Sequence, residues 1–235
     1  MSLKNWDNKT WLSSPSYIKS FNSFLLKQIK LNKNSQILDI GCGRGKILGS
    51  LSSKLSLKRK SIGIDIENHK DRDKRIIFKK IDALKFLKKN KKRFDLILVK
   101  QTIHLFKIKD IKTILKFSKR LLNPNGKIII FTLDPINNEI PTFSIMKKKL
   151  KKALIRDKKI IKSISYSFKG KIVRGFSYKV KISKKKYMEM VNSKYISVLL
   201  GMSHKLISSG LNEIKKKYKK QISFQDKLIC LVLNK

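Results

Sequence analysis

The chain has 235 residues, enough for one domain with a sizeable core, and its 41% hydrophobic content argues against global disorder. No apolar run approaches the ~20 residues that a membrane helix needs, and the first residues, MSLKNWDNKTWLSS, lack the apolar centre of a signal peptide. Because Cys42 and Cys230 offer no disulfide framework, we expect a cytoplasmic protein.

The formal charge of +43 has two interpretations. It would suit a partner such as nucleic acid or an anionic membrane. It is also typical of a genome rich in A and T, because lysine far outnumbers arginine, isoleucine and asparagine are abundant, and alanine occurs only at Ala83 and Ala153. The basic residues are scattered along the chain, which favours this compositional interpretation. In either case the charge attracts anionic small molecules at low salt.

The chain begins with two expected short helices within residues 1–34, and from residue 35 short apolar segments alternate with helical patterns. The expected strands are 36–40, 61–65, 75–80, 94–99 and 127–132. Helical patterns follow at 46–55 and at 108–122, the second of which stops at the turn sequence NPNG. Strands that are apolar on both faces and alternate with helices predict an α/β fold with a doubly wound, mostly parallel sheet.

The pattern changes after residue 134. A basic amphipathic helix is expected at 144–164, followed by a hairpin within 166–182, helices near 184–193 and 203–219, and a last strand at 227–234. The amphipathic helix could lie on a membrane surface. We interpret it instead as a cap whose lysines face water.

The glycine loop after the first strand departs from the dinucleotide-binding pattern. That pattern places a third glycine or alanine where the helix packs on the strand. Here Gly41 and Gly43 fit, but Lys46 occupies the third position and the additional glycine is Gly45. Asp39, on the strand itself, would repel a pyrophosphate but can receive an ammonium group. The loop therefore favours a nucleoside with a cationic tail over NAD.

Two further carboxylates follow the next two strands. Asp65 ends the second strand, where it can accept both ribose hydroxyls, and Glu67 can share that role. Asp82 follows the third strand, where an adenine amino group could donate to it, although Asp82 can equally cap the next helix. Carboxylates at three successive strand ends suit an uncharged adenosine at the edge of the sheet where ligands bind.

Together these segments resemble the motif series of class I S-adenosylmethionine-dependent methyltransferases. The matching segments lie within residues 35–133 and read ILDIGCGRG, IGIDIE, KIDAL, FDLILVKQTIHLF and LLNPNGKIIIF. More loosely, FSYKVKISKKKYMEMVNSKYIS and FQDKLICLVLNK resemble the C-terminal half of small-molecule enzymes similar to trans-aconitate methyltransferases. The resemblance implies a Rossmann-like methyltransferase fold of seven strands with N-terminal helices and a C-terminal cap insertion.

The same resemblance implies one methyltransferase domain over residues 1–235 that binds S-adenosylmethionine. Its parts would be an N-terminal helical lid (1–34), a cofactor-binding core (35–133), a cap insertion with helices (134–220) and a last strand (221–235). Gln101 is implied beside the sulfonium. The implied cofactor-binding residues are Asp39, Gly41, Cys42, Gly43, Gly45, Asp65, Ile66, Asp82, Ala83 and Gln101. Lys100 departs from the small or polar residues usual at its position, because a cation beside a sulfonium must point away or bind an acidic substrate.

Methyl transfer from a sulfonium is an in-line displacement, in which positioning can supply ~7–11 kcal/mol of the barrier. Gln101 and His104 are the candidate catalytic residues. A hydroxyl or ammonium acceptor needs a base, and His104 is the candidate, although it can equally be a packing residue. His69 and His204 carry no partner motif and are expected on the surface. No metal is expected.

The N-terminal aromatic residues have two interpretations. Trp6, Trp11 and Tyr17 can close over the site as a lid that shelters a cation by cation–π contact. Alternatively, they staple the first helix onto the sheet.

The favoured function is methyl transfer to a small metabolite, including an anionic one. The alternative is an RNA methyltransferase acting on rRNA or tRNA, which the charge would suit. Exocyclic-amine methylation in this family uses an Asn/Asp-Pro-Pro-aromatic run where this chain has KQTI, and neither cysteine is placed for carbon-5 pyrimidine methylation. Ribose or ring-nitrogen methylation stays open, as does cofactor binding without catalysis.

Overall fold

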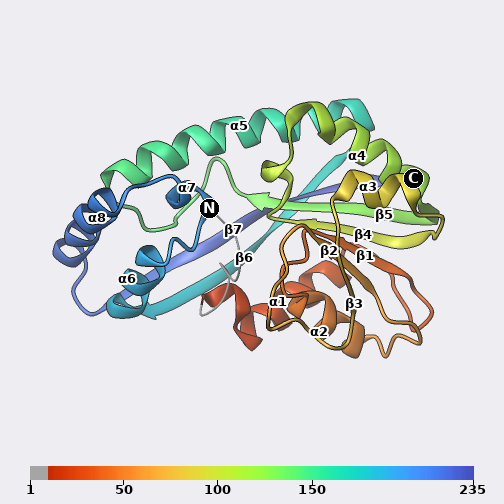
Figure 1. Ribbon diagram of the computed structural model, residues 1–235, viewed down its shortest axis with the longest axis horizontal. Helices are drawn as coiled ribbons and strands as arrows, with labels where there is room; N and C mark the ends of the chain where they lie inside the picture. Colours follow the sequence, from red (N-terminus) through yellow and green to blue (C-terminus); the bar gives the residue numbers. More distant parts are fainter. Residues whose placement is uncertain (1–9) are drawn as a thin grey trace.

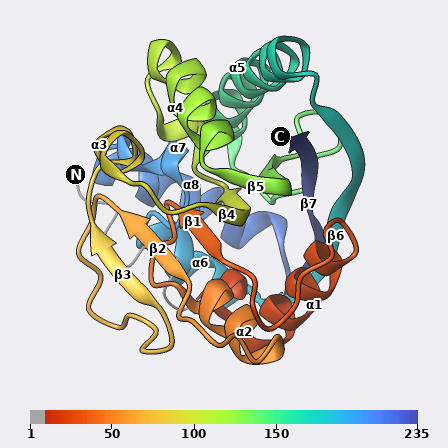
Figure 2. The same cartoon turned by 90° about the vertical axis from the view of Figure 1, so that its right-hand side faces the viewer.

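The computed structural model describes residues 10–235, so Trp6 lies outside the described residues. Within this range seven strands form one sheet in the order β3-β2-β1-β4-β5-β7-β6 (Figures 1 and 2). The first five strands pair in parallel, whereas β7 runs antiparallel to β5 and β6 antiparallel to β7. The expected doubly wound, mostly parallel α/β fold is confirmed.

The elements follow the expected order along the chain. The strands are β1 (Ile37–Ile40), β2 (Ile62–Asp65), β3 (Ile77–Lys80), β4 (Phe94–Lys100), β5 (Leu122–Leu133), β6 (Lys171–Ser183) and β7 (Gln221–Asn234). The helices are η1 (Trp11–Ser13), α1 (Pro15–Leu26), α2 (Lys46–Lys54), α3 (Ala83–Lys89), η2 (Ile103–Leu105), α4 (Ile108–Arg120), α5 (Ser144–Phe168), α6 (Lys184–Asn192), α7 (Ser197–Leu200) and α8 (His204–Lys217).

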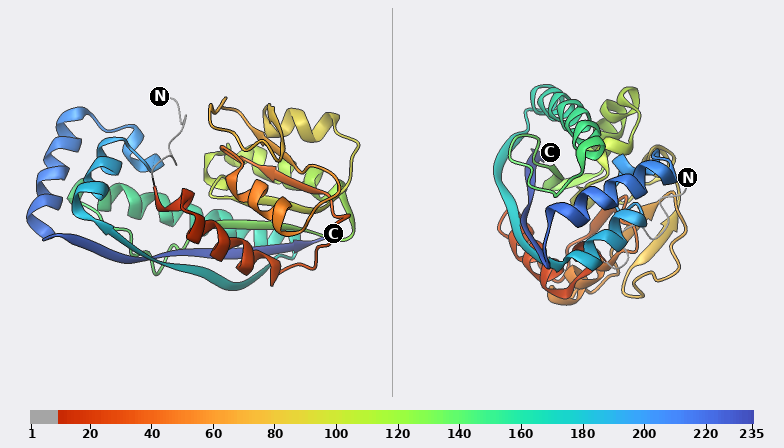
Figure 3. Two further views of the ribbon diagram at one scale, coloured as in Figure 1. Left: turned by 90° about the horizontal axis from the view of Figure 1, so that it is seen from below. Right: turned by 90° about the vertical axis from the view of Figure 1, so that its left-hand side faces the viewer.

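The helices cover the sheet in two layers. Helices α1 and α2 lie on one face and α3, α4 and the end of α5 on the other, while α6, α7 and α8 form a lobe beyond the carboxyl ends of the parallel strands (Figures 1 and 3). All four residues of β1 are buried, as a central parallel strand with helices on both faces requires. Each face of the sheet therefore has its own hydrophobic core.

Helix α5 joins the two cores. Its first half buries Met146, Leu150 and Leu154 in the core that contains α1 and α6. Its second half buries Ile160 and Ile164 in the core that contains α3 and α4. The lysines between these apolar positions remain at the surface, which agrees with a cap interpretation of this basic amphipathic helix.

The hairpin expected within 166–182 is wrong. The segment is one long strand, β6, that pairs with β7 along its whole length. Gly175 lies where the register shifts between Val173 and Phe176, and a Cβ at this glycine would lie 2.4 Å from the carbonyl oxygen of Leu228. This glycine therefore marks a bulge, at which the two backbones approach closely, and not a chain reversal.

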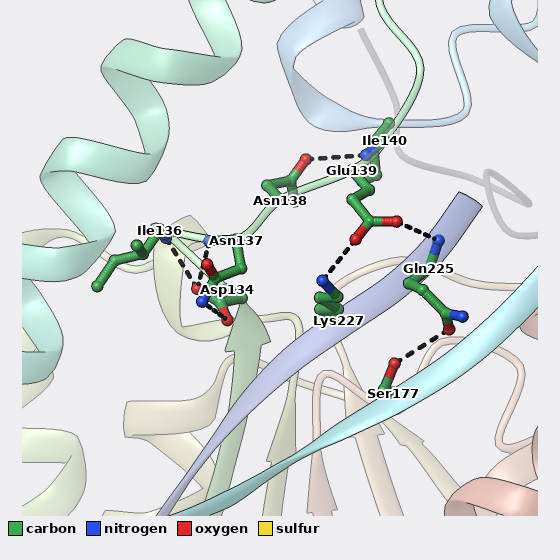
Figure 4. A network of polar contacts seen from close by, with 9 residues as sticks. All are labelled: Asp134, Ile136, Asn137, Asn138, Glu139, Ile140, Ser177, Gln225 and Lys227. Atoms are coloured by element: carbon green, nitrogen blue, oxygen red, sulfur yellow. Dashed lines mark hydrogen bonds and ion pairs between the residues drawn. The ribbon is translucent and has the colours of Figure 1, made fainter.

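The segment between β5 and α5 is tied to the neighbouring strand β7 (Figure 4). Glu139 accepts hydrogen bonds from Lys227 Nζ at 2.5 Å and from the Gln225 N–H at 2.9 Å. Asp134 caps the turn by accepting from the N–H groups of Ile136 and Asn137 at 2.8 and 3.0 Å. These bonds fix the direction in which the chain leaves the sheet toward the lobe.

Candidate active site

A cavity of about 420 Å³ lies at the carboxyl ends of β1, β2 and β4. It lies at the edge where open α/β sheets bind ligands. Nine of the ten implied cofactor-binding residues line it, namely Asp39, Gly41, Cys42, Gly43, Asp65, Ile66, Asp82, Ala83 and Gln101. Gly45 is not among the lining residues.

The glycine loop turns sharply between β1 and α2. Gly41 has a φ of +74°, and a Cβ there would lie 2.2 Å from the Cγ2 atom of Thr102, whose hydroxyl donates to the Gly41 carbonyl at 3.3 Å. Gly45 has a φ of +71° at the start of α2, and a Cβ there would meet Ile76 at 2.2 Å. Only glycine combines this backbone with such close packing. Gly45 thus holds the loop against the core behind the cavity.

Asp65 is held by the backbone of its neighbours. Its Oδ2 accepts from the Gly43 N–H and its Oδ1 from the Glu67 N–H, both at 2.9 Å. Burial opposes ionisation, but contacts with His69 and these two N–H groups outweigh it and lower the pKa of Asp65 below its usual value. An ionised carboxylate has about four lone-pair sites, so the contacts with these neighbours leave room for a ribose hydroxyl to donate.

His69 is buried, and the expectation of a surface position is wrong. Its exposed fraction is 2%, and its Nε2 lies 3.8 Å from Asp65 Oδ1. The chain after β2 folds back so that the imidazole, four residues on, reaches the carboxylate and lines the cavity. His204 is exposed at the start of α8, as expected.

Asp39 offers the cavity a buried carboxyl oxygen, Oδ1, that has no hydrogen-bond partner among the described residues. The residue is 4% exposed. Burial raises its pKa to about 7; Lys100 acts to lower the pKa, and Asp65 acts to raise it. A buried carboxylate oxygen without a partner is costly. The site therefore fits a ligand that brings an ammonium group, as S-adenosylmethionine does.

We expect the affinity for S-adenosylhomocysteine to fall by about tenfold between pH 8 and pH 6, because the ammonium group needs the ionised form of Asp39. Calorimetric titrations across this range measure the affinity, and its change with pH should be absent in the Asp39→Asn variant.

The same raised pKa affects the stability of the protein, because the stability contributed by Asp39 is lost as pH rises through about 7. At pH 8 the unliganded Asp39→Asn protein should therefore melt above the wild type. An equal change of affinity with pH in the wild type and in Asp39→Asn would contradict the assignment of Asp39 to the ammonium group.

The part of the cavity near the start of α3 combines polar and apolar residues. Asp82 caps α3, since its Oδ1 accepts from the Lys85 N–H at 3.1 Å, so the capping interpretation is confirmed. The same residue lines the cavity together with buried Ala83 and with Ile66, which is 60% exposed. Capping and contact with a base are therefore compatible, because the carboxylate has a second oxygen.

Gln101 occupies a strained position at the end of β4. Its φ is +51°, a conformation uncommon for residues other than glycine. Its side-chain oxygen accepts from Lys100 Nζ at 2.6 Å, and this ammonium lies 5.3 Å from the ring centres of Tyr17 and Phe21. The Lys100 charge is therefore engaged by the N-terminal aromatic rings and by Gln101.

Trp11 and Tyr17 lie in the hydrophobic core, and neither lines the cavity. Trp11 Nε1 donates to Asp226 Oδ2 at 3.0 Å. The Trp11 ring meets Tyr195 and Phe224 edge to face at 5.4 and 5.1 Å. Tyr17 is fully buried. Only Leu12 of the described N-terminal segment reaches the cavity wall, so the stapling interpretation describes the observed contacts of these two aromatic residues.

His104, the candidate base, lies in η2 and lines a smaller cavity next to the main one. Its Nε2 is 3.5 Å from Ser197 Oγ, and its Nδ1 is buried without a hydrogen-bond partner among the described residues. Burial lowers its pKa, against the attraction of Asp157, so the imidazole is neutral near pH 7. A neutral imidazole can accept a proton.

Two residues of this region were missed by the sequence analysis. Asp226 could have been found, because Ile222, Phe224, Asp226 and Leu228 alternate on one face of β7 and all four are buried. His69 had no such signal, since it lies in an irregular segment whose path depends on the rest of the fold.

Among residues 10–235, no three side chains of the metal-binding types (His, Cys, Asp and Glu) lie close enough together to hold a metal ion. Within the same range, no helix combines the length and the apolar character needed to cross a membrane.

Several solved structures share this fold. A putative methyltransferase from an antibiotic biosynthesis pathway of Anabaena variabilis is 14% identical, with a TM-score of 0.64 over 91% of this chain and 96% of that chain. A methyltransferase of Geobacter sulfurreducens in complex with S-adenosyl-L-homocysteine is 13% identical, with a TM-score of 0.56 over 94% and 90%. The plantazolicin methyltransferase BpumL is 16% identical, with a TM-score of 0.51 over 98% and 89%. No curated protein sequence matches the chain.

The sequence itself matches a known family, described as a methyltransferase domain, over residues 31–195. This range includes the glycine loop, all the described strand ends that line the cavity, and α5 and β6. The match and the seven-stranded fold confirm the expected class I S-adenosylmethionine-dependent methyltransferase. The chain belongs to the methyltransferase domain family.

Proposed function

We propose that this enzyme transfers the methyl group of S-adenosylmethionine to a small metabolite, in the manner of enzymes similar to trans-aconitate methyltransferases. The observation that carries the proposal is the position of Gln101, which lines both the cofactor cavity and a smaller neighbouring cavity. An acceptor group that occupies a cavity of about 60 Å³ beside the cofactor has to be small. We also propose that the reaction takes place in the cytoplasm, on the basis of cysteine usage.

The proposed division of the chain follows from this function. Residues 35–133 form the cofactor-binding core, residues 134–220 a cap insertion that shapes the acceptor site, and residues 221–235 the last strand. Residues 1–34 form the N-terminal helical part, proposed as a lid through Leu12, while Trp11 and Tyr17 attach it to the core. Every cofactor-binding assignment then falls on the core. The acceptor is recognised by the parts outside it.

The cofactor-binding residues that line the cavity have distinct proposed roles. Bound S-adenosylmethionine supplies a methyl group on a positively charged sulfur, which an acceptor displaces in line. Asp39 receives the ammonium group, Asp65 the ribose hydroxyls, and Asp82 with Ala83 the adenine. Gln101 lines both cavities, between the cofactor and the acceptor, and its side-chain oxygen accepts a hydrogen bond from Lys100. Gly41 and Gly43 expose backbone to the sugar and the methionine chain, and Cys42 and Ile66 complete the wall.

A second candidate is methylation of rRNA or tRNA, which the formal charge of +43 favours. Phosphate contacts make such binding strongly salt-dependent. The charge also increases the local concentration of an anionic small acceptor, so it does not by itself separate the two substrates.

The experiment that separates them follows the methyl label. Purified enzyme is incubated with methyl-labelled S-adenosylmethionine and a cell extract, and the label is separated by size with and without ribonuclease. We expect label in the small-molecule fraction, unaffected by ribonuclease, and none with the Asp39→Asn/Asp65→Ala double variant. Label in large, ribonuclease-sensitive material would replace the small-molecule proposal by the RNA one.

A further inference from the structure

A second cavity of about 60 Å³ lies between the end of β5, η2, α5 and α7. Gln101 and Leu105 line both this cavity and the cofactor cavity, so the two are neighbours. In Figure 1, α7 lies beneath the first half of α5, on the side of the sheet where β5 ends. The cavity therefore lies next to the part of the cofactor cavity where Gln101 is proposed to face the sulfonium.

The wall of this cavity is mostly apolar, with two unsatisfied polar atoms. Leu133, Leu150, Ala153, Leu154, Ile196 and Val198 provide the apolar part. His104 Nδ1 and Thr132 Oγ1 are both buried and without a hydrogen-bond partner among the described residues, and Thr132 is 1% exposed. Leaving such an atom unpaired costs ~1–3 kcal/mol. A ligand group that donates and accepts hydrogen bonds would remove both penalties.

The charges on the wall disfavour an anion. Arg156 is the cation among the lining residues, and its Nε and Nη2 already donate to Asp157 Oδ1 at 3.1 and 2.9 Å. Asp157 is 6% exposed and lies near enough to His104 to favour its protonated form. A carboxylate or phosphate placed here would face Asp157, whose negative charge already offsets that of the Arg156 guanidinium.

We propose that this second cavity holds the reacting group of the methyl acceptor, a neutral hydroxyl carried on a small aliphatic group, hydrogen-bonded to His104 Nδ1 and Thr132 Oγ1. The inference rests on the proposed function and specifies its acceptor. Any negative charge on the acceptor then lies outside this cavity, at a distance from the reacting oxygen.

The proton balance of the reaction follows from the histidine. With Nε2–H donating to Ser197 Oγ, Nδ1 is left as an acceptor for the hydroxyl proton. The acceptor oxygen bonds to the methyl carbon while the sulfur–carbon bond breaks, and that electron pair stays on sulfur in S-adenosylhomocysteine. The hydroxyl proton moves to Nδ1, and the imidazolium that forms is stabilised by Asp157 until it releases the proton to solvent.

Binding of a minimal alcohol tests the proposal without turnover. The enzyme, saturated with S-adenosylhomocysteine and labelled at its three histidines, is titrated by nuclear magnetic resonance with 1-propanol and, separately, with propionate, an anion of similar size. The His104 signals, assigned with His104→Gln, should shift in a saturable way with 1-propanol. They should move at least about fivefold less with propionate at equal concentration, since an anion at this wall faces Asp157, whose charge already offsets that of Arg156. The exposed His204 should respond to neither.

Two variants make the test specific. Ala153→Leu fills the cavity with a good helix former and should abolish the 1-propanol shift, and Thr132→Val, of similar shape, should weaken it. S-adenosylhomocysteine should bind both variants as it binds the wild type by calorimetry. An equal response to propionate, or a 1-propanol shift that persists in Ala153→Leu, would overturn the inference while the methyltransferase function stands. If the wild type itself fails to bind S-adenosylhomocysteine, the proposed function is wrong.

Discussion

Asp65→Ala is expected to weaken the binding of S-adenosylhomocysteine by about tenfold or more, because two hydrogen bonds from ribose to a charged acceptor are lost. The carboxylate is held ready for this role by the Gly43 and Glu67 N–H groups at 2.9 Å. Removing it also frees these two donors and leaves buried His69 without its carboxylate partner. The effect on affinity should therefore exceed that of one lost contact.

Calorimetric titration measures this change, with Asp71→Ala as the matched control. Asp71 lies in the same segment after β2, is exposed, and does not line the cavity, so its removal changes the net charge equally. His69→Asn should weaken binding less than Asp65→Ala, since it alters the support of the carboxylate and not the carboxylate itself. If Asp65→Ala binds as tightly as Asp71→Ala, the ribose assignment fails.

Trp11→Ala should lower the free energy of unfolding by about 3–5 kcal/mol, as the loss of a large buried aromatic side chain does. The indole packs edge to face on Tyr195 and Phe224, and its N–H donates a hydrogen bond to Asp226, which is fully buried. Truncation opens a cavity and leaves a buried carboxyl group with fewer partners. Burial already raises the pKa of Asp226, and the hydrogen bond from Trp11 acts to lower it, so the loss of this bond further destabilises the ionised carboxylate.

Urea denaturation of Trp11→Ala and Trp11→Phe tests this prediction. Trp11→Phe keeps an aromatic ring and removes the N–H. It should lower the free energy of unfolding by about 1–3 kcal/mol, which is less than the effect of Trp11→Ala. Both should bind S-adenosylhomocysteine as the wild type does, because Trp11 does not line the cavity. A raised KM for the acceptor with unchanged unfolding would instead identify the aromatic residues as a lid.

The proposed cofactor site could be located from sequence because its parts are local. Asp39, Asp65 and Asp82 each follow a short apolar segment, and parallel strands bring their carboxyl ends to one edge of the sheet. The glycines Gly41, Gly43 and Gly45, which the sequence marked as a cofactor loop, all have positive φ. Neighbouring residues decide these features, so no long-range contact had to be known.

Contacts between distant segments decided the rest. Trp11 and Asp226 are 215 positions apart and meet because β7 inserts between β5 and β6. The expected hairpin became the single strand β6 because β7 offered a full-length partner, and pairing with it satisfies more backbone groups than a local turn. The position of His104 beside Thr132 depends in the same way on the packing of α5 and α7 over the end of β5.

The amino-acid sequence by itself determined the class of fold, the glycine loop and the carboxylates at the strand ends, since periodicity and turn residues act over a few positions. The tertiary structure alone decided which polar groups are buried without partners, including Asp39 Oδ1 and His104 Nδ1. Burial is a property of the whole packed chain, because each wall of a cavity comes from a different element. For that reason the sequence indicated the class of cofactor, whereas the proposal for the methyl acceptor rests on the packing.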